Sequence, residues 1–341
     1  MNPSISAVIP VYNRFDLLKH SVESVLAQTL PVCEVILVDD GSIDDTPERL
    51  PRYIEENPRW RERVVYFHQE NQGQSAATNN GIAKAKGEWL AFNANDDYWL
   101  PQKLEWQFRA LDQFKECGAC FTDAWFMNNP KMKMTLFQLG GKQHDEPVGI
   151  ISDPLRYVVD RGRGMGVHPV WVQTMVVRTD LVHRLNGFDA SLRYGDDDDF
   201  VFRLACETKL CFVSMPMMLI DRTPPAQRHV GAATNWDTAA YRLRMTQQRF
   251  EKRLRMNGRL PVEVQQATRR DLSAVHSEWA NWHLLNQDFD KAAASVSEAA
   301  KLNLTPKLAI KWTLTHFLPS LARKSVLARE QKRQRSIEGI G

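Results

Sequence analysis

The sequence predicts an α/β fold for residues 1–232, with a Rossmann-like, mostly parallel sheet flanked by helices, and an α-helical extension for residues 233–341. Apolar strand signals alternate with helical signals over about the first 130 residues, and this alternation favours a parallel sheet covered on both faces. Near residue 236 the composition becomes rich in Arg, Gln and Ala and poor in strand formers. The length of 341 residues suits one large domain with an appendage.

Five short apolar runs are expected to be strands. They lie at residues 6–11, 33–42, 63–69, 88–94 and 119–127. Helical spacing of apolar residues, or a terminal glycine, predicts helices at residues 15–28, 75–87 and 100–114. Residues 127–165 have no clear period, and we interpret them as loops on the substrate side. Further apolar structure follows at residues 168–178, and a last strand is expected at residues 210–220. Parallel sheets bind ligands at the carboxyl ends of their strands, and several acids lie at these ends.

Composition and hydropathy exclude several classes of protein. With 43% hydrophobic and 25% charged residues, the chain is an ordinary globular protein that needs no disulfide or structural metal. Cys117 and Cys120 form a CxxC pair, but zinc would need a second pair, so we interpret them as buried small hydrophobes in preference to a metal or redox site. No signal peptide is evident and no run reaches the roughly 18 apolar residues of a spanning helix. A cytoplasmic chain, soluble or peripheral on the inner face of the membrane, is expected.

Charge is distributed unevenly although the net charge is only +3. Acids gather at residues 39–45 and 196–199, and Arg and Lys gather at residues 242–259 and 323–335. This asymmetry predicts an acidic, metal-using site in one region and a basic surface in another.

The helical part carries two further patterns. Residues 277–303 resemble one helix-turn-helix unit of the tetratricopeptide kind. Residues 308–328 are amphipathic and basic. This segment either packs on the body with a solvated charged face or contacts an anionic membrane surface.

Asp39 and Asp40 end the second expected strand, in the stretch LVDDGS. A carboxylate at this end of a strand commonly accepts hydrogen bonds from a ribose, and we favour a nucleotide-binding role for Asp39. The alternative for these acids, and more so for Asp40 than for Asp39, is a turn former, and Asp44 or Asp45 is a candidate cap of the next helix. The glycine turn before Ser75 leads into a helix whose first backbone N–H groups can face an anionic ligand.

The doublet of Asp96 and Asp97 follows the fourth expected strand, in FNANDDYWLP. Two hard oxygen donors at one strand end suit Mg²⁺ or Mn²⁺, which prefer carboxylate, water and phosphate ligands. The alternative is a plain helix cap, because Leu100 and Pro101 open a helix just after the doublet. The surrounding motifs favour the metal ligand.

Four adjacent acids stand at Asp196 to Asp199, in RYGDDDDF. Adjacent carboxylates repel one another unless they are solvated or shared with a cation. Only some of them can face inward, so at most two are expected to be catalytic. Solvation at a helix N-terminus, where the helix dipole favours acids, is our interpretation of Asp198 and Asp199.

Five blocks taken together resemble glycosyltransferase family 2. They are SAVIPVYNR, VILVDDGSIDDT, ENQGQSAATNNGIAKAKGEWLAF, NDDYWLPQKLEWQ and LNGFDASLRYGDDDDFVFRLA. The resemblance covers about residues 4–232 and does not reach the C-terminal third. It implies a GT-A fold, a nucleotide-diphosphate sugar donor with a UDP-sugar favoured, a divalent metal (Mn²⁺ or Mg²⁺) and inversion at the anomeric carbon.

The resemblance also implies roles for the residues around the donor. Asp39 resembles the acid that reads the nucleoside base, at the pocket whose first-strand edge corresponds to Pro10, Val11 and Tyr12. Asp96 resembles the second acid of the family's DxD element, the metal ligand beneath the diphosphate.

The resemblance extends to the reacting groups. Asp197 resembles the general base, and Asp196 stands beside it where glutamate is more usual. His229 resembles a downstream histidine that approaches the diphosphate and can share the metal. A surface histidine is the alternative at that position.

Two positions depart from the family pattern. Ala94 stands where the first acid of DxD is usual, and Asn95 or Asn93 is the candidate substitute, as a neutral acceptor to the ribose. Thr78 stands where an arginine is usual, and that arginine would support the nucleotide. Both departures bear on how the donor is held.

The expected function is transfer of a sugar to a hydroxyl of a glycan or lipid-linked acceptor, with Asp197 taking the hydroxyl proton and a metal at Asp96 acting as Lewis acid. No nucleic-acid partner is expected. Because Ala94 and Thr78 depart from the pattern, the alternative is a catalytically weakened nucleotide-sugar-binding or glycan-binding protein on the same fold. A nucleotidyltransferase is disfavoured, since IPVYNRFD offers Arg14 but no glycine. Three tryptophans are interpreted as core residues, with stacking on a sugar as the alternative: Trp99, Trp125 and Trp171.

Overall fold

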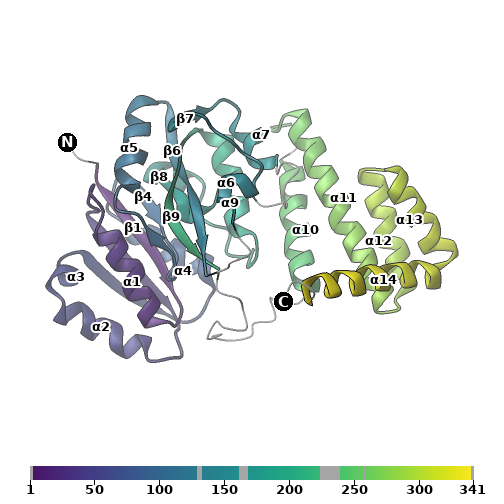
Figure 1. The fold of residues 1–341 in the computed structure, drawn as a ribbon, viewed down its shortest axis with the longest axis horizontal. Helices are drawn as coiled ribbons and strands as arrows, with labels where there is room; N and C mark the ends of the chain where they lie inside the picture. Colours follow the sequence, from purple (N-terminus) through teal and green to yellow (C-terminus); the bar gives the residue numbers. More distant parts are fainter. Residues whose placement is uncertain (1–2, 129–132, 161–167, 223–238, 257, 339–341) are drawn as a thin grey trace. The chain divides into compact units, whose positions relative to one another are not determined.

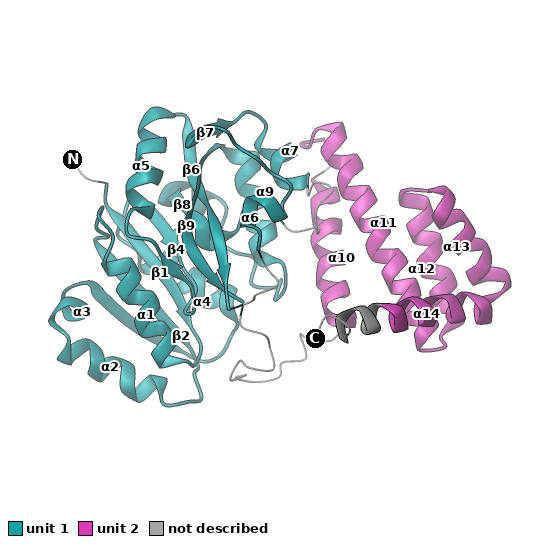
Figure 2. Ribbon diagram, viewed as in Figure 1, with its two compact units in different colours: residues 1–233 teal, residues 234–341 magenta. Residues whose placement is uncertain are grey.

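The computed structural model describes residues 3–128, 133–160, 168–222, 239–256 and 258–338. The chain forms two compact units, made of residues 1–233 and 234–341 (Figures 1 and 2).

The described part of the first unit contains a nine-stranded sheet in the order β3-β2-β1-β4-β8-β6-β9-β5, with β7 also paired to β9. The strands are β1 (Ile5–Val11), β2 (Glu34–Asp40), β3 (Val64–Gln69), β4 (Trp89–Phe92), β5 (Tyr98–Trp99), β6 (Cys117–Met127), β7 (Val148–Ile151), β8 (Met175–Arg178) and β9 (Lys209–Asp221). The expected α/β class is confirmed, but the sheet is mixed. Parallel pairs join β1 to β2 and β4, β2 to β3, and β6 to β9, whereas β5, β7 and β8 pair antiparallel.

The helices of the first unit follow the expected alternation, and three elements appear where only loops were expected. The helices are α1 (Phe15–Leu26), α2 (Thr46–Glu56), α3 (Pro58–Arg63), α4 (Gln74–Lys84), α5 (Lys103–Gln113), α6 (Leu136–Leu139), α7 (Pro154–Val159), the 3-10 turn η1 (Val172–Thr174), α8 (Thr179–Arg184) and α9 (Asp196–Glu207). The loop interpretation was wrong for α6, β7 and α7. These elements are too short to show a periodic signal. Side-chain caps stabilise the starts of the two helices: a capping box at Thr135 begins α6, and Asp153 caps α7.

Alternate residues of β2 explain why helices cover both faces of the sheet. Val35 and Leu37 point into the core that α1 closes, whereas Ile36 and Val38 pack towards α4. Gly81 on α4 allows the close approach, because an added Cβ would lie 2.6 Å from the side chain of Val8. A strand buried on both faces reads as a continuous apolar run, as residues 35–38 of β2 do.

The second unit is helical throughout its described residues, as the composition predicted. It consists of α10 (Ala239–Arg255), α11 (Val262–Leu285), α12 (Phe289–Leu302), α13 (Pro306–Phe317) and α14 (Pro319–Glu338). Small apolar residues join α11, α12, α13 and α14 in two core clusters, and α14 runs across the helices that it contacts (Figure 2). Among the described residues, none of the helices combines the length and the apolar character needed to cross a membrane.

Candidate active site

A cavity of about 250 Å³ lies where β4 ends and α9 begins. Asp96 and Asp97 line it from the loop after β4, and Asp196 and Asp197 line it from the first turn of α9. Pro10 of β1 completes this edge. The fold thus brings into one cavity two acidic motifs that lie about a hundred residues apart in the sequence.

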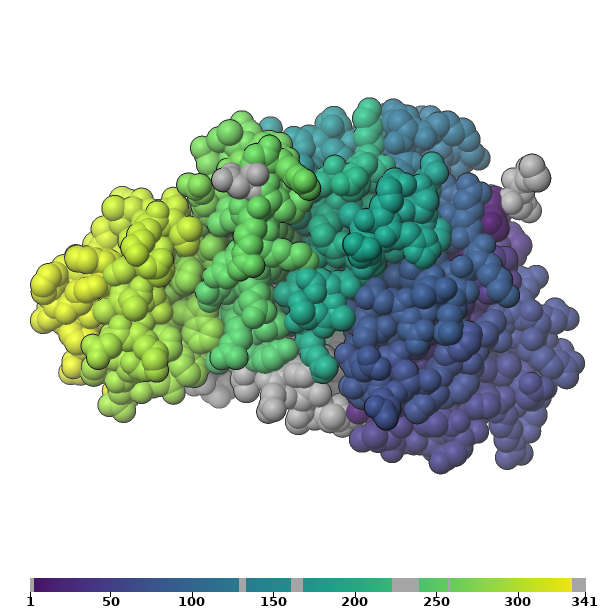
Figure 3. All heavy atoms as spheres, turned by 180° about the vertical axis from the view of Figure 1, so that it is seen from behind, coloured from purple at the N-terminus to yellow at the C-terminus, as the bar shows by residue number. Residues whose placement is uncertain are grey.

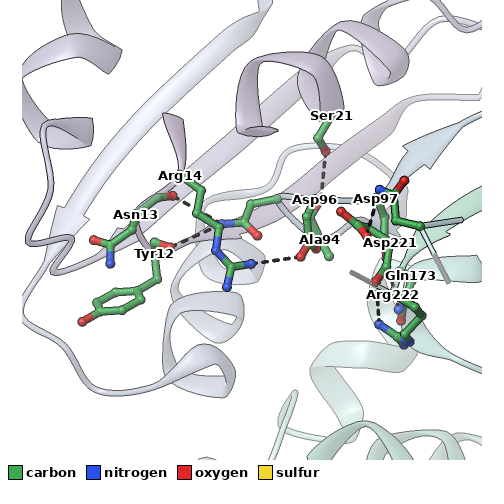
Figure 4. Close-up of polar contacts among 12 residues, drawn as sticks. Tyr12, Asn13, Arg14, Ser21, Ala94, Asp96, Asp97, Gln173, Asp221 and Arg222 are labelled. Carbon is green, nitrogen blue, oxygen red and sulfur yellow. Dashed lines mark hydrogen bonds and ion pairs between the residues drawn. The ribbon is translucent and has the colours of Figure 1, made fainter. Parts of the chain in front are cut away.

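Asp96 forms an ion pair with Arg14, with 3.0 Å between Oδ2 and Nη1 (Figure 4). Arg14 precedes α1 in a left-handed conformation, with φ of 66°, and Asn13 before it has φ of 59°. Such conformations cost free energy in residues other than glycine and persist where the surroundings hold them. Here the backbone N–H of Arg14 donates to Asp44, and the Oδ1 atom of Asn13 accepts from Ile43. The loop after β1 is therefore fixed with its guanidinium at the cavity.

Asp97 is buried and joins the ends of β4 and β9. Its Oδ1 accepts the backbone N–H of Asp221 at 2.9 Å, and its Oδ2 accepts from Gln173 at 3.3 Å (Figure 4). Burial, and then the negative charge of Asp96, raise the pKa of Asp97 to about 7, against the lowering effects of these hydrogen bonds and of Arg222. Both carboxylate oxygens of Asp97 are thus engaged within the protein, whereas Asp96 offers its carboxylate to the cavity.

The segment before the doublet is tied to α1 and β1. The carbonyl of Ala94 accepts from Ser21, whose hydroxyl accepts in turn from the side chain of Asn93. Asn93 thus faces inward and is buried. Asn95 points the other way, and its Nδ2 lies 3.5 Å from the carbonyl of Tyr12. Of the two candidate substitutes for the missing acid, Asn95 lies at the end of β1, where the nucleotide edge was expected.

Asp39 is fully buried at the end of β2 and does not line the cavity. Its two carboxylate oxygens accept from the backbone N–H of Ser42 and the hydroxyl of Tyr66. Val11 is buried in the core, so it can border a pocket only through its backbone. The nucleotide-binding roles of Asp39, Pro10, Val11 and Tyr12 stay predictions.

Asp40 organises the loop that leads into α4. Its carboxylate accepts the backbone N–H groups of Gln72 and Gly73 and the side chain of Gln69. These bonds are those of a turn former, which was the alternative for Asp40. They also fix the start of α4, which contacts the other end of the cavity.

Asp196 and Asp197 begin α9 after Gly195, which has a left-handed φ of 76°. The Ser75 hydroxyl of α4 donates to Asp196. Burial raises the pKa of Asp196, and the bond from Ser75 opposes that change. Burial, together with the charges of Asp196 and Asp198, holds the pKa of Asp197 well above its usual value. A raised pKa suits the Asp197 carboxylate to the role of a general base.

Helix α4 is also clamped to the loop before α9. The side-chain amide of Asn79 donates to the carbonyl of Phe188 and accepts its N–H, both at 2.8 Å. A side chain at Gly187 would collide with this amide. In Figure 3 the blue surface of residues near 80 adjoins the teal surface of residues near 190. This clamp sets Ser75 beside Asp196.

The expectation of solvation was wrong for Asp199. It is 1% exposed and pairs with Arg203 one helical turn later, at 2.7 Å. Asp198 pairs with His168 at 3.0 Å, and both side chains are 11% exposed. The four acids thus separate by helical geometry into two that face the cavity and two with cationic partners in the protein.

Sequence reasoning missed Arg222, the residue directly after β9. Arg222 lines the cavity and lies over the ring of Trp171, 4.6 Å from its centroid. Thr78 lines the same cavity without a charge. Arg222 therefore brings a guanidinium to a site where the usual arginine is missing. The position of Arg222 at the end of a strand could have indicated a site residue. Gln173 also lines the cavity, and no sequence pattern indicated it.

The tryptophans divide between the two interpretations. Trp99 is a core residue, 3% exposed. Trp171 is half-buried beneath Arg222. The core interpretation was wrong for Trp125, which is 44% exposed on β6. Cys117 and Cys120 are buried, which confirms their interpretation as small hydrophobes.

The donor set suits a cation shared with a ligand. Among the described residues, no three His, Cys, Asp or Glu side chains are arranged to hold a metal ion, and His229 lies outside the described residues. However, Mg²⁺ and Mn²⁺ are usually held by one or two carboxylates together with substrate phosphates and water. Asp96 fits that mode, because it lines the cavity with only one oxygen bound to Arg14.

Comparison with known proteins finds a family to which this unit is similar. Residues 6–162 match the family model described as glycosyl transferase family 2. An uncharacterised glycosyltransferase of Rickettsia typhi is 28% identical over 203 residues, 59% of this chain and 58% of that protein. The putative teichuronic acid biosynthesis glycosyltransferase TuaG of Bacillus subtilis is 38% identical over 120 residues, 35% of this chain and 46% of that protein. The chain thus spans only about half the length of these relatives.

A solved structure shares the fold over nearly the whole chain. The crystal structure of residues 1–349 of S. aureus TarS in complex with UDP-GlcNAc covers 97% of this chain and 92% of its own, with a TM-score of 0.66 and 15% identity. At that identity the likeness establishes the fold alone. The mixed sheet with flanking helices is the GT-A fold, followed by a helical region.

Proposed function

The N-terminal unit is a family 2 glycosyltransferase domain, and we propose that it transfers a sugar from a nucleotide-diphosphate donor, a UDP-sugar by preference, to a hydroxyl of a glycan or lipid-linked acceptor. The observation that carries the proposal is the convergence of Asp96 and Asp197 on one cavity of about 250 Å³. TarS, which has this fold, binds UDP-GlcNAc, and this supports the choice of donor.

The acceptor oxygen forms a bond to the anomeric carbon as the bond from that carbon to the diphosphate oxygen breaks. Asp197 takes the hydroxyl proton, and the nucleoside diphosphate leaves with its electron pair. A carboxylate whose pKa lies well above the usual value accepts this proton more readily. Attack opposite to the leaving group inverts the anomeric carbon, and no protein nucleophile is needed.

The leaving group needs positive charge, and two side chains at the cavity supply it. Arg14 and Arg222 bring guanidinium groups, which match phosphate oxygens in a bidentate manner. Asp96 would hold Mn²⁺ or Mg²⁺ together with the diphosphate. When bound, such an ion neutralises charge on the departing diphosphate. Asp96 would then exchange its bond to Arg14 for the metal and leave the guanidinium for phosphate.

The test is turnover with a panel of nucleotide sugars and hydroxyl acceptors, with Mn²⁺, with Mg²⁺ and with a chelator. Released nucleoside diphosphate is measured. We expect release with at least one donor that increases when the acceptor is present and falls when the metal is removed. A folded protein that binds nucleotide sugar but releases nothing with any acceptor would instead be the weakened binding protein that Ala94 suggests.

We further propose that the C-terminal unit contacts an anionic membrane surface. Phe317, Leu318 and Leu321 are 71%, 54% and 52% exposed where α13 meets α14, and Lys324 is exposed on the next turn. Apolar side chains beside cations suit the interface of anionic lipids. Cosedimentation with phosphatidylglycerol vesicles should exceed that with phosphatidylcholine vesicles and decrease in Phe317→Ser. Equal recovery with both lipids would exclude this contact.

A further inference from the structure

A cavity of about 560 Å³ lies in the C-terminal unit, between α11, α13 and α14. Its volume falls within the range of sites for small ligands. Four cationic side chains line it, from all three helices, and they are Arg270, Lys307, Lys311 and Arg329. Glu278 is the single acid in the lining. The cavity thus carries an excess of positive charge.

The cations of this cavity have no carboxylate partner within hydrogen-bonding range among the described residues. Lys311 instead donates to the hydroxyl and carbonyl of Ser277. Burial lowers the pKa of Lys311 to about 8, and the charges of Arg329 and Lys307 lower it while Glu278 opposes them. Arg270, Lys307 and Arg329 are exposed around the more buried Lys311, and an anion among them would reduce the repulsion between these like charges. The cavity therefore suits a negatively charged ligand.

The lining also presents groups that bind hydroxyls. Ser277, Thr305 and Ser325 carry hydroxyls at the wall. Asn281 donates to Glu278, while its Oδ1 atom is buried with no hydrogen-bond partner in the described structure. The hydroxyls at the wall can donate to and accept from the hydroxyls of a ligand. Cations together with hydroxyl-binding groups indicate a ligand that carries both acid and alcohol groups.

We propose that this cavity binds an acidic sugar unit, carboxylated or phosphorylated, of the acceptor glycan. The proposal rests on the proposed transfer to a glycan and names its acceptor class. Arginine forks recognise carboxylate and phosphate alike, so one cavity accepts either. Because the lining is concave and combines cations and hydroxyls with apolar side chains, it suits the edges and the apolar face of a sugar ring better than the flat surface of a membrane. Holding the acceptor on the same chain would raise its effective concentration at the bound sugar donor.

The test measures binding to the full-length protein by titration calorimetry, without turnover. The probes are an oligogalacturonide of three residues, glucose 1-phosphate, and maltotriose as the neutral control. The double variant Arg270→Gln/Arg329→Gln is compared with Arg269→Gln/Lys324→Gln. The second pair consists of exposed cations on the same helices that do not line the cavity, so both variants lose the same charge.

We expect an acidic probe to bind and maltotriose not to bind. The cavity variant should weaken binding by about 10-fold or more, because hydrogen bonds to charged groups are lost, whereas the control variant should change it less than about 3-fold through screening alone. UDP affinity should be equal in the wild type, the cavity variant and the control variant. Weaker binding of the acidic probe in the cavity variant alone can therefore be distinguished from a failure of the transferase proposal. Equal weakening in both variants, or binding of neither acidic probe, would overturn the inference. The inference would also be overturned if the protein bound phosphatidylglycerol vesicles through Arg270 and Arg329 and did not bind the sugars.

Discussion

The cavity between β4 and α9 and the cavity between α11, α13 and α14 hold ionisable groups of opposite sign. Asp97 in the first has a pKa raised to about 7, and Lys311 in the second has a pKa lowered to about 8. Burial is the largest cause in both cases, because it disfavours whichever form is charged. The two differ in their neighbours. Arg14 and Arg222 stand among the acids of the first, whereas Glu278 alone opposes four cations in the second.

This difference separates the tasks that the two cavities suit. The first holds both signs close together, as a site must when charge moves between reacting atoms. The second holds one sign in excess, which suits steady binding of an anion. Each of the following measurements perturbs one side of this contrast against a matched change.

The largest effect is expected at the base. Asp197→Asn removes the proton acceptor without changing the size of the side chain, so kcat should fall about 10²–10⁴-fold, while UDP affinity is kept. The matched change is Asp198→Asn, which loses the pair with His168 but leaves the cavity acids in place. Steady-state kinetics with the best donor tests this. Equal losses in both variants would assign the effect to the helix rather than to proton transfer.

The next effect concerns stability at the same turn. Asp199→Ala leaves Arg203 partly buried without its partner, which should lower the free energy of unfolding by about 3–5 kcal/mol. Asp180→Ala removes two exposed pairs, with Arg178 and Arg184, and should cost about 0–1 kcal/mol. Urea titration compares them. If the two variants unfold alike, the buried pair does not support α9.

The smallest effect is a pH dependence of opposite sign in the two cavities. From about pH 4 to 7 the native state binds a proton at Asp97 that the unfolded chain does not bind, so the free energy of unfolding should fall as pH rises, by at most about 1.4 kcal/mol per pH unit. Between about pH 8 and 10.5 the unfolded chain retains a proton that native Lys311 has lost, so the free energy should rise with pH.

Two substitutions assign these slopes. Asp97→Asn should reduce the lower slope, to which Asp196 and Asp197 also contribute because their pKa values are raised. Lys311→Met should reduce the upper slope, and urea titrations across pH measure both. The charged groups that face Lys311 are Glu278, Lys307 and Arg329, from all three helices. Slopes that persist in these variants would assign the titrations to other groups.

Local signals predicted most of the fold, and tertiary structure decided the rest. The apolar run of β2 and the helical patterns of α5 and of the C-terminal region could be recognised in the sequence, because burial imposes such patterns on these segments. Short elements such as β7 and α6 escaped because their stability comes from capping and pairing with distant strands. The antiparallel pairing of β8 depends on contacts with β4 and β6, which no local pattern records.

The site shows the same division. Asp96, Asp196 and Asp197 stand in motifs and could be named from the sequence. Whether a carboxylate faces the cavity depends on the pitch of α9, which turned Asp199 towards Arg203. Arg222 joined the site only because β9 ends beside β4 through Asp97.

That link between Asp97 and the backbone of Asp221 gives the protein a natural spectroscopic probe. The amide proton of Asp221 is donated to a carboxylate oxygen whose charge changes near neutral pH. The nuclear magnetic resonance shift of this single amide therefore reads the electrical state of the cavity. Nucleotide, metal ion and acceptor could each be followed through it without a label.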